Sequence, residues 1–292
     1  YLGEGKWQSQ FHIGAKWANV IRYRWPEFKR YARFFYDMPH FFTLLNINGR
    51  MVPAHATHTS YPDPHEETST VDGYIRKSNG GSWSANRGAS DGNYSADDEE
   101  TWYVADIYGY IKIRRQWGLF DTSSIPDTDG VSAAVLSVSG WQVNDDGGVG
   151  EIHRICLVGG SPDSNTAIED EDYSNMTALN SPTELIPRTW SLATFSGDGN
   201  ANNNSFTFNA DGRAYIAKDG ITKLMMRNSF DVDDSAPTTE DNNGYARAAD
   251  YTGTDKDPRL VVTHGPPSNV DKINGIALAD IEKVNGITAA NA

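Results

Sequence analysis

An acidic run after Phe230 holds the residues best suited to chemistry in this 292-residue chain. Asp231, Asp233 and Asp234 place carboxylates at positions i, i+2 and i+3, and oxygen ligands of this kind suit Ca²⁺. The run has no glycine at the sixth place and no glutamate at the twelfth, so it is not an EF-hand loop. This run is the strongest metal candidate in the sequence. The alternative is that it binds no metal.

Tryptophans form the second candidate set. Their rings stack on sugars through contacts between the ring face and C–H groups, or they pack in a core, which is the more common role of tryptophan in a large β domain. The glycan-binding candidates are Trp83, Trp102, Trp141 and Trp190.

Two further clusters of charged residues or histidines are either metal sites or solvated surface segments. Asp97–Glu100 offers four carboxylates that could hold calcium, or it is a solvated charge cluster. His55, His58 and His65 lie near Asp63 and Glu66 in a segment rich in proline and threonine, but their spacing matches no zinc signature. A solvated loop is the favoured interpretation of that segment.

The usual catalytic signatures do not occur in the sequence. It contains no G-x-S-x-G, P-loop, dinucleotide fingerprint or H-E-x-x-H. The single cysteine, Cys156, lies in HRICLVGG, which predicts a buried and inert thiol. These features favour a protein that is not an enzyme. A glycoside hydrolase is a minor alternative, because two well-placed carboxylates suffice and the chain has 39 acidic residues.

Residues 110–140 indicate the elements that must position these groups. Ile111, Ile113, Trp117 and Leu119 alternate with polar residues, which predicts a strand with one buried face. A connection rich in Asp, Thr and Ser follows, and then a second alternating run that contains Leu136. Further strands are expected at 71–76, 152–158, 190–195, 205–208, 245–249 and 259–264, and a short helix at 170–179.

The run FDTSSIP, followed by SAAVLSVSG, resembles the DNRLRE-type, carbohydrate-binding-module-like jelly-roll domains of phage virion proteins and bacterial surface proteins. Three more segments agree in order: PDPHEETSTVDGYIRKSNGGSWSANRGA at 62–89, KDGITKLMMRNSFDVDDSAP at 218–237 and YTGTDKDPRLVVTH at 251–264. The resemblance covers residues 58–265. It implies a jelly-roll β-sandwich in a virion or extracellular setting and implies no activity, since one fold hosts many functions.

The charge of the chain limits its partners. The net charge of −14 argues against nucleic acid, whose binding depends on neutralising phosphates. No run approaches the roughly 18 apolar residues that span a bilayer, and no signal peptide is apparent. Release of virions by lysis would place such a protein outside the cell.

The two ends of the chain differ from its middle. Residues 1–50 hold eight Lys or Arg against three acidic residues, and 13 aromatics. Residues 1–57 are therefore a basic aromatic docking arm, or an extension upstream of a start at Met51. In the tail, 266–292, DKINGIALADI is echoed by EKVNGITAANA, and Asn-Gly between apolar residues predicts small hairpins. Units this small need a neighbour to cover their apolar face, which predicts assembly through the tail; a frayed terminus is the alternative.

The sequence thus predicts an all-β protein: a jelly-roll β-sandwich of antiparallel strands with a small C-terminal β-arch or hairpin extension. The expected function is a non-enzymatic extracellular or virion structural protein, such as a phage decoration, fibre or tail-associated component, with glycan binding as a further role. The alternative is a secreted carbohydrate-binding module for cell-surface polysaccharide. The expected partners are other virion proteins, further copies of this chain, or a cell-surface glycan.

Overall fold

A computed structural model describes residues 44–47, 50–53, 55–62, 69–108, 112–145, 151–238, 242–266, 272–273 and 276–277. The chain divides into two compact units, one of residues 57–264 and the other of residues 1–56 with 265–292. The first unit holds all the candidate site residues whose side chains are described.

An eight-stranded antiparallel sheet forms the larger layer of residues 57–264. Its main strand order is β10-β12-β7-β6-β13-β9, and β4 pairs with both β7 and β5. Its strands are β4 (Asp72–Ser78), β5 (Tyr94–Ala96), β6 (Thr101–Tyr108), β7 (Lys112–Asp121), β9 (Gly140–Asp145), β10 (Ile155–Gly159), β12 (Ile221–Asn228) and β13 (Asn242–Arg247).

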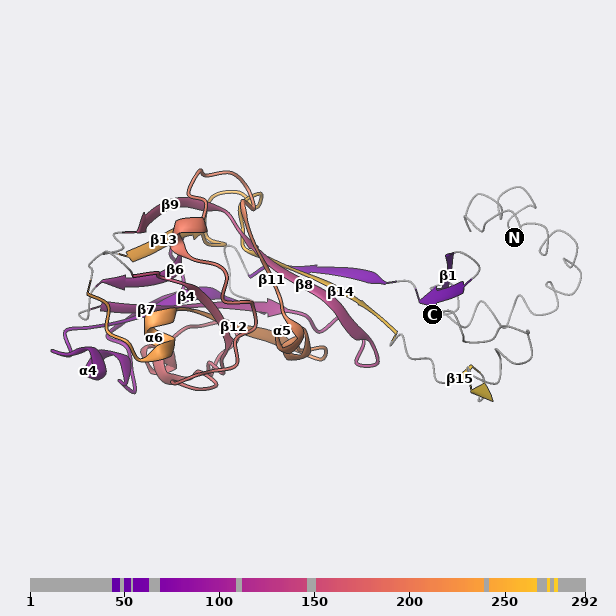
Figure 1. Ribbon diagram of the computed structural model, residues 1–292, viewed down its shortest axis with the longest axis horizontal. Helices are drawn as coiled ribbons and strands as arrows, with labels where there is room; N and C mark the ends of the chain where they lie inside the picture. Colours follow the sequence, from indigo (N-terminus) through magenta and orange to yellow (C-terminus); the bar gives the residue numbers. More distant parts are fainter. Residues whose placement is uncertain are drawn as a thin grey trace, which may run out of the picture. The chain divides into compact units, whose positions relative to one another are not determined.

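A four-stranded sheet forms the second layer, in the order β11-β8-β14-β3. Its strands are β3 (Ala56–Ser60), β8 (Gly130–Val138), β11 (Asn204–Thr207) and β14 (Arg259–Gly265). The two layers make an all-β sandwich of antiparallel strands, as the sequence predicts (Figure 1). The jelly-roll connection pattern stays a prediction.

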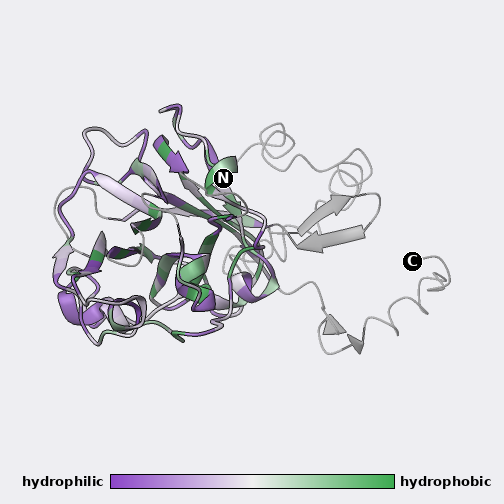
Figure 2. Ribbon diagram, turned by 60° about the vertical axis from the view of Figure 1, so that its left-hand side comes forward, coloured by the Kyte–Doolittle hydropathy of each residue, from purple (hydrophilic) through white to green (hydrophobic). Residues whose placement is uncertain are grey.

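The main core fills the space between the two sheets. Phe120 of β7, Leu136 of β8 and Phe206 of β11 are fully buried there. In Figure 2 the hydrophobic residues gather on the strands inside the body, and hydrophilic residues predominate on the loops around it. The prediction that Trp117, Leu119 and Leu136 are inaccessible to water is confirmed, since each is 0% exposed. Of the three, only Leu136 lies between the two sheets.

The eight-stranded sheet is covered on both faces, which the alternation in β7 does not reveal. Trp117 and Leu119 point away from the inter-sheet core and pack with Tyr173 and Met225 in a second cluster. Arg115 shares their parity and is also 0% exposed. A strand with both faces buried is expected to be apolar throughout, so a buried arginine needs partners that local sequence does not identify.

Short helices lie beside this outer face: α4 (Trp83–Arg87), α6 (Ser229–Asp233) and the 3₁₀ helix η2 (Asp170–Ser174). Of the helix expected at 170–179, only the first part is formed, as the 3₁₀ helix at Asp170–Ser174. A fourth helix, α5 (Ala210–Tyr215), starts from Asn209, whose side chain accepts a hydrogen bond from the Gly212 backbone N–H. Such capping satisfies a free N–H of the first turn.

The prediction of a strand at 190–195 is wrong. Leu192–Thr194 forms the 3₁₀ helix η3 instead. The Ser191 N–H donates to Thr194 Oγ1 at 3.1 Å, and the same hydroxyl donates back to the Ser191 carbonyl. Hydroxyl side chains that bond the nearby backbone compete with strand pairing in this way.

Two small hairpins are described in the second unit. β15 (Lys272–Ile273) pairs with β16 (Ile276–Ala277), so the Asn-Gly hairpin expected in the tail is confirmed for the first repeat. Its echo at 282–292 lies outside the described residues. β1 (Leu44–Ile47) and β2 (Arg50–Pro53) form another hairpin around an Asn-Gly pair, which the sequence analysis missed although the signal is the same.

Candidate functional site

The structure separates the three aspartates proposed as metal ligands. Asp231 is buried among arginines, Asp233 is paired with Arg188 at 2.6 Å, and Asp234 accepts a hydrogen bond from Trp83 Nε1 at 3.2 Å. Among the described residues, no three His, Cys, Asp or Glu side chains gather closely enough to hold a metal ion. The chemistry of Asp231 is therefore ion pairing, and calcium binding by this run stays a prediction without a ligand set.

Asp231 is the centre of a buried arginine cluster. Arg115 from β7 donates to both carboxylate oxygens of Asp231, through Nε at 2.9 Å and Nη2 at 2.8 Å. Arg227 from β12 donates through Nε at 2.7 Å, and Arg87 of α4 donates to the Asp231 backbone carbonyl at 2.6 Å. The side chains of both partners in the Arg115–Asp231 ion pair are at most 1% exposed.

The remaining guanidinium donors of this cluster hold the connection after η2. Arg115 donates to the carbonyl of Tyr173, and Arg87 and Arg227 both donate to the carbonyl of Leu179. Burial would raise the pKa of Asp231, but Arg115 and Arg227 hold it well below its ordinary value. The cluster is thus a structural tie that joins β7, β12, α4 and α6 with the 173–180 segment.

The four candidate tryptophans have different surroundings. Trp102 is 1% exposed and packs in the inter-sheet core, and Trp83 is 8% exposed. Trp190 is half-buried and contacts Phe206 edge to face, with centroids 4.8 Å apart. Trp141 is half-buried too, but it belongs to a larger set of aromatic residues.

That set, which we call the aromatic row, takes rings from five strands of the eight-stranded sheet. Its rings follow one another at centroid distances of 5.7, 4.5, 5.5 and 5.4 Å. One strand of the sheet, β7, lies between β4 and β6 and contributes no ring; its Arg114 lies over the Tyr103 ring instead. In order, the rings are Tyr94 (β5), Tyr74 (β4), Tyr103 (β6), Tyr245 (β13) and Trp141 (β9).

The rings of the row stand mostly on edge. Tyr103 meets Tyr74 at 66° and Tyr245 at 76°, whereas Trp141 stacks on Tyr245 at 23°. Burial raises the pKa of the Tyr74 and Tyr103 hydroxyls, so both stay protonated at neutral pH and keep an O–H donor. Tyr74 is only 3% exposed, so the hydroxyl groups that the row presents to solvent are those of its other tyrosines.

Three arginines cover ring faces of the row. The Arg76 guanidinium lies 4.7 Å from the Tyr94 centroid, and Arg114 lies 4.1 Å from that of Tyr103. Arg247 lies between Trp141 at 4.8 Å and Tyr251 at 3.9 Å. Each contact is within the range of a cation–π interaction, which is worth about 0.5–1 kcal/mol at an exposed site.

The three arginines differ in how their charge is balanced. Arg114 forms an ion pair with the buried Asp106 at 2.6 Å. Within the described part of the chain, the guanidinium groups of Arg76 and Arg247 form no hydrogen bond or ion pair; their Nε atoms are buried without a partner, whereas their terminal nitrogens are not buried. The row therefore has an unpaired guanidinium near each end.

Sequence analysis found only Trp141 of this row, and for a different role. The Tyr245 ring and the Arg247 guanidinium both contact the face of Trp141, so this ring supports an arginine and does not offer a free platform. A usable signal exists in the motif Tyr-x-Arg, which occurs in β4 (Tyr74, Arg76) and β13 (Tyr245, Arg247) and puts both side chains on one face of a strand.

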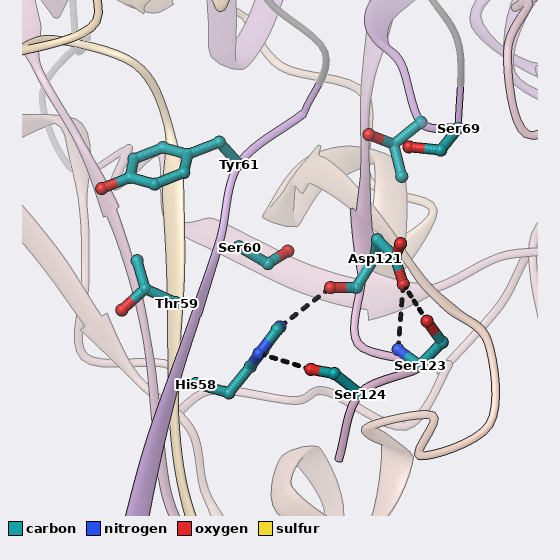
Figure 3. Close-up of a pocket in the computed structure, with 9 residues that line it drawn as sticks. His58, Thr59, Ser60, Tyr61, Ser69, Asp121, Ser123 and Ser124 are labelled. Carbon is teal, nitrogen blue, oxygen red and sulfur yellow. Dashed lines mark hydrogen bonds between the residues drawn. The ribbon is translucent and has the colours of Figure 1, made fainter.

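A pocket of about 230 Å³ lies between β3 and the end of β7. In Figure 3 the His58 ring sits between Asp121 and Ser124. His58 Nε2 donates to the Asp121 carbonyl at 2.9 Å, which leaves Nδ1 to accept from Ser124 Oγ, also at 2.9 Å. The Asp121 carboxylate is engaged by Ser123.

This histidine could accept a proton from Ser124, but its other nitrogen meets a backbone carbonyl and not a carboxylate. A carboxylate is what stabilises the imidazolium that forms in a Ser-His-Asp site. The contacts instead tie β3 to the β7–β8 connection. Of the three histidines that the sequence raises as a group, only His55 and His58 lie in the described residues.

Cys156 is buried in β10, as the sequence predicts, and burial raises the pKa of its thiol strongly. Among the described residues, no helix has the length and apolar content needed to cross a bilayer. A comparison of the sequence with protein-family models and with curated proteins finds no match.

Proposed function

We propose that this chain is a non-enzymatic extracellular or virion structural protein whose β-sandwich binds a glycan through the aromatic row. The observation that carries the proposal is the row itself, in which the partly or fully exposed rings of Tyr94, Tyr103, Tyr245 and Trp141 lie close to two unpaired arginines. The Tyr74 ring is 3% exposed and supports its neighbours Tyr94 and Tyr103. A row of this kind offers what a sugar chain requires, namely hydrogen-bond donors next to apolar ring surface.

The physical argument depends on preorganisation. A guanidinium stacked on a ring keeps its in-plane N–H donors free while its orientation is held. Tyr103 and Tyr245 are packed between neighbouring rings, so little side-chain entropy is lost when a ligand binds. The terminal nitrogens of Arg76 and Arg247, unlike their buried Nε atoms, are open to a ligand and have no protein acceptor to give up, so a ligand gains their hydrogen bonds at low cost.

The structural part of the proposal rests on the resemblance to virion and surface jelly-roll domains and on the tail. The hairpin of β15 and β16 has two residues in each strand, which is too little to bury an apolar face of its own. Assembly with further copies or with other virion proteins would provide that cover. A secreted carbohydrate-binding module is the alternative, and it uses the same row.

A glycan array with the full chain tests the binding role. We expect the wild type to bind at least one bacterial surface polysaccharide, and Trp141→Ala to weaken that binding by roughly tenfold through loss of the support for Arg247. Tyr61→Ala is the matched control, because Tyr61 is an exposed aromatic, at 44%, outside the row. Thermal unfolding of each variant shows whether it is folded.

If no polysaccharide binds the wild type, glycan binding is rejected and only the architectural role is left. Proteomics of purified virions tests that role, and a consistent failure to find the chain in particles would favour the secreted module. Release of reducing ends from a bound polysaccharide would instead indicate the glycoside hydrolase.

A further inference from the structure

The charge of the aromatic row points to the kind of glycan that it takes. Arg76 and Arg247 are cations without a carboxylate partner in the described part of the chain, whereas Arg114 between them is neutralised by Asp106. We propose that the row binds an acidic polysaccharide, whose carboxylates form paired hydrogen bonds with the guanidinium groups of Arg76 and Arg247. This inference rests on the proposed glycan-binding role of the row.

Arginine is suited to this task in a way that lysine is not. Its planar fork matches a carboxylate with two parallel N–H···O bonds, and its flat face stacks on an aromatic ring at the same time. Arg247 is held between Trp141 and Tyr251, and Arg76 lies over Tyr94. Both forks are therefore oriented before a ligand arrives.

The two cations lie near opposite ends of the row, separated by rings on five strands. The four centroid steps between Tyr94 and Trp141 are each 4.5–5.7 Å, so a single small sugar cannot reach both guanidinium groups. A polymer with regularly repeated carboxylates can. Its second contact then forms within the complex at a high effective concentration, which increases the total affinity.

The net charge of the chain opposes an anionic ligand but does not decide the local interaction. The chain carries −14 overall. At physiological ionic strength exposed charges more than about 8 Å apart are largely screened. A carboxylate in contact with Arg247 therefore experiences that guanidinium far more strongly than acidic residues elsewhere on the chain. At the other end of the row a carboxylate is closer, because Glu99 accepts a hydrogen bond from the Tyr94 hydroxyl at 3.2 Å, so Arg247 is the stronger of the two anion contacts.

A single-stranded nucleic acid is also an anionic polymer, but the row fits it poorly. Bases require flat ring faces on which to stack. Tyr103 is edge-on to both of its neighbours, and Arg114 lies on its face. A net charge of −14 further opposes a backbone with a phosphate at every nucleotide.

The test compares two probes with the same sugar chain: polygalacturonate, which has a carboxylate on each sugar, and its fully methyl-esterified form, in which each carboxylate is a neutral methyl ester. Binding of the full chain to each is measured by biolayer interferometry at low and high salt. We expect the acid form to bind at least about tenfold more tightly than the ester, and its affinity to fall as salt rises. Arg76→Gln and Arg247→Gln should each weaken binding roughly 3- to 10-fold, and the double variant by more.

Arg259→Gln is the matched control. Arg259 of β14 is also without a side-chain partner among the described residues, but no ring contact is found for it. Loss of charge at Arg259 should leave binding unchanged. If Arg259→Gln weakens binding as much as Arg76→Gln and Arg247→Gln do, the effect comes from net charge alone and the inference is overturned. Thermal unfolding confirms that each glutamine variant is folded.

The outcomes separate this inference from the function on which it rests. Equal binding of the acid and the ester, with Trp141→Ala weakened, would reject the acidic ligand and leave glycan binding in place. No binding of either probe, together with an empty glycan array, would reject both. Tighter binding of oligo-dT than of polygalacturonate would overturn the inference in favour of a nucleic acid.

Discussion

Replacement of Asp231 by asparagine tests the buried arginine cluster most directly. The variant keeps the size of the side chain and one oxygen acceptor but removes the negative charge. Arg115 and Arg227, whose side chains are both 0% exposed, would then be buried without a counter-charge. Removal of one partner from a buried ion pair is far more costly than the loss of an exposed one, because the remaining charge cannot regain its water.

The expected cost is about 3–5 kcal/mol in the free energy of unfolding. For a domain of this size about 1 kcal/mol corresponds to roughly 2–4 °C, so the melting temperature should fall by about 6–20 °C. Asp233→Asn is the matched control, only two residues away. The Asp233 side chain is 46% exposed and paired with Arg188, so its loss should cost less than about 1 kcal/mol.

Calorimetry of the wild type and both variants, in the full chain, measures these shifts. Asp231→Asn melting within about 2 °C of the wild type would refute the cluster as a structural tie. The same scans with added Ca²⁺ test the metal hypothesis for Asp231, Asp233 and Asp234. A wild-type chain that is stabilised by Ca²⁺, and an Asp231→Asn variant that is not, would show that the carboxylates serve a cation after all.

The pH dependence follows from the same cluster. The pKa of Asp231 is lowered on folding, so its contribution to stability is fully present above its ordinary pKa of about 3.9 and is lost as pH falls towards the folded value. The difference in melting temperature between the wild type and Asp231→Asn should thus be constant from about pH 5 to 8. It should shrink below about pH 4.

Three further predictions concern the core. Gly118→Ala should destabilise the chain by about 1–3 kcal/mol in urea unfolding, because an added Cβ would lie 2.2 Å from the Trp102 ring, whereas Gly220→Ala, with no atom within 4 Å, should not. Leu136→Ala should cost about 2–5 kcal/mol in the same assay. A loss of less than about 0.5 kcal/mol, as is usual at surface positions, would contradict its place in the core. Cys156 should resist Ellman's reagent at pH 8 in the native chain and react once unfolded, since burial raises its pKa; rapid native labelling would disprove the burial.

Alternation in the sequence was sufficient to predict an antiparallel β domain, whereas the expectation of a sandwich came from the resemblance to jelly-roll domains. A side-chain period of two marks strands such as β7 and β8 whatever their partners are, and the Asn-Gly pair marks the hairpin of β15 and β16. The strand expected at 190–195 failed for a local reason, the hydroxyl bonds of Ser191 and Thr194. Its neighbourhood is apolar enough to suggest a strand, but the backbone is bonded to side chains.

Both sites, in contrast, were decided by tertiary structure. The arginine cluster joins Arg87, Arg115 and Asp231, which lie up to 144 residues apart, and the acidic run alone suggested a metal site. The row takes one ring from each of five strands, and the order of those strands in the sheet differs from their order in the chain. A periodic pattern specifies which side chains share a face of one strand. Which strands are neighbours depends on pairing between distant segments, and that pairing alone aligned the rings with the two unpaired arginines.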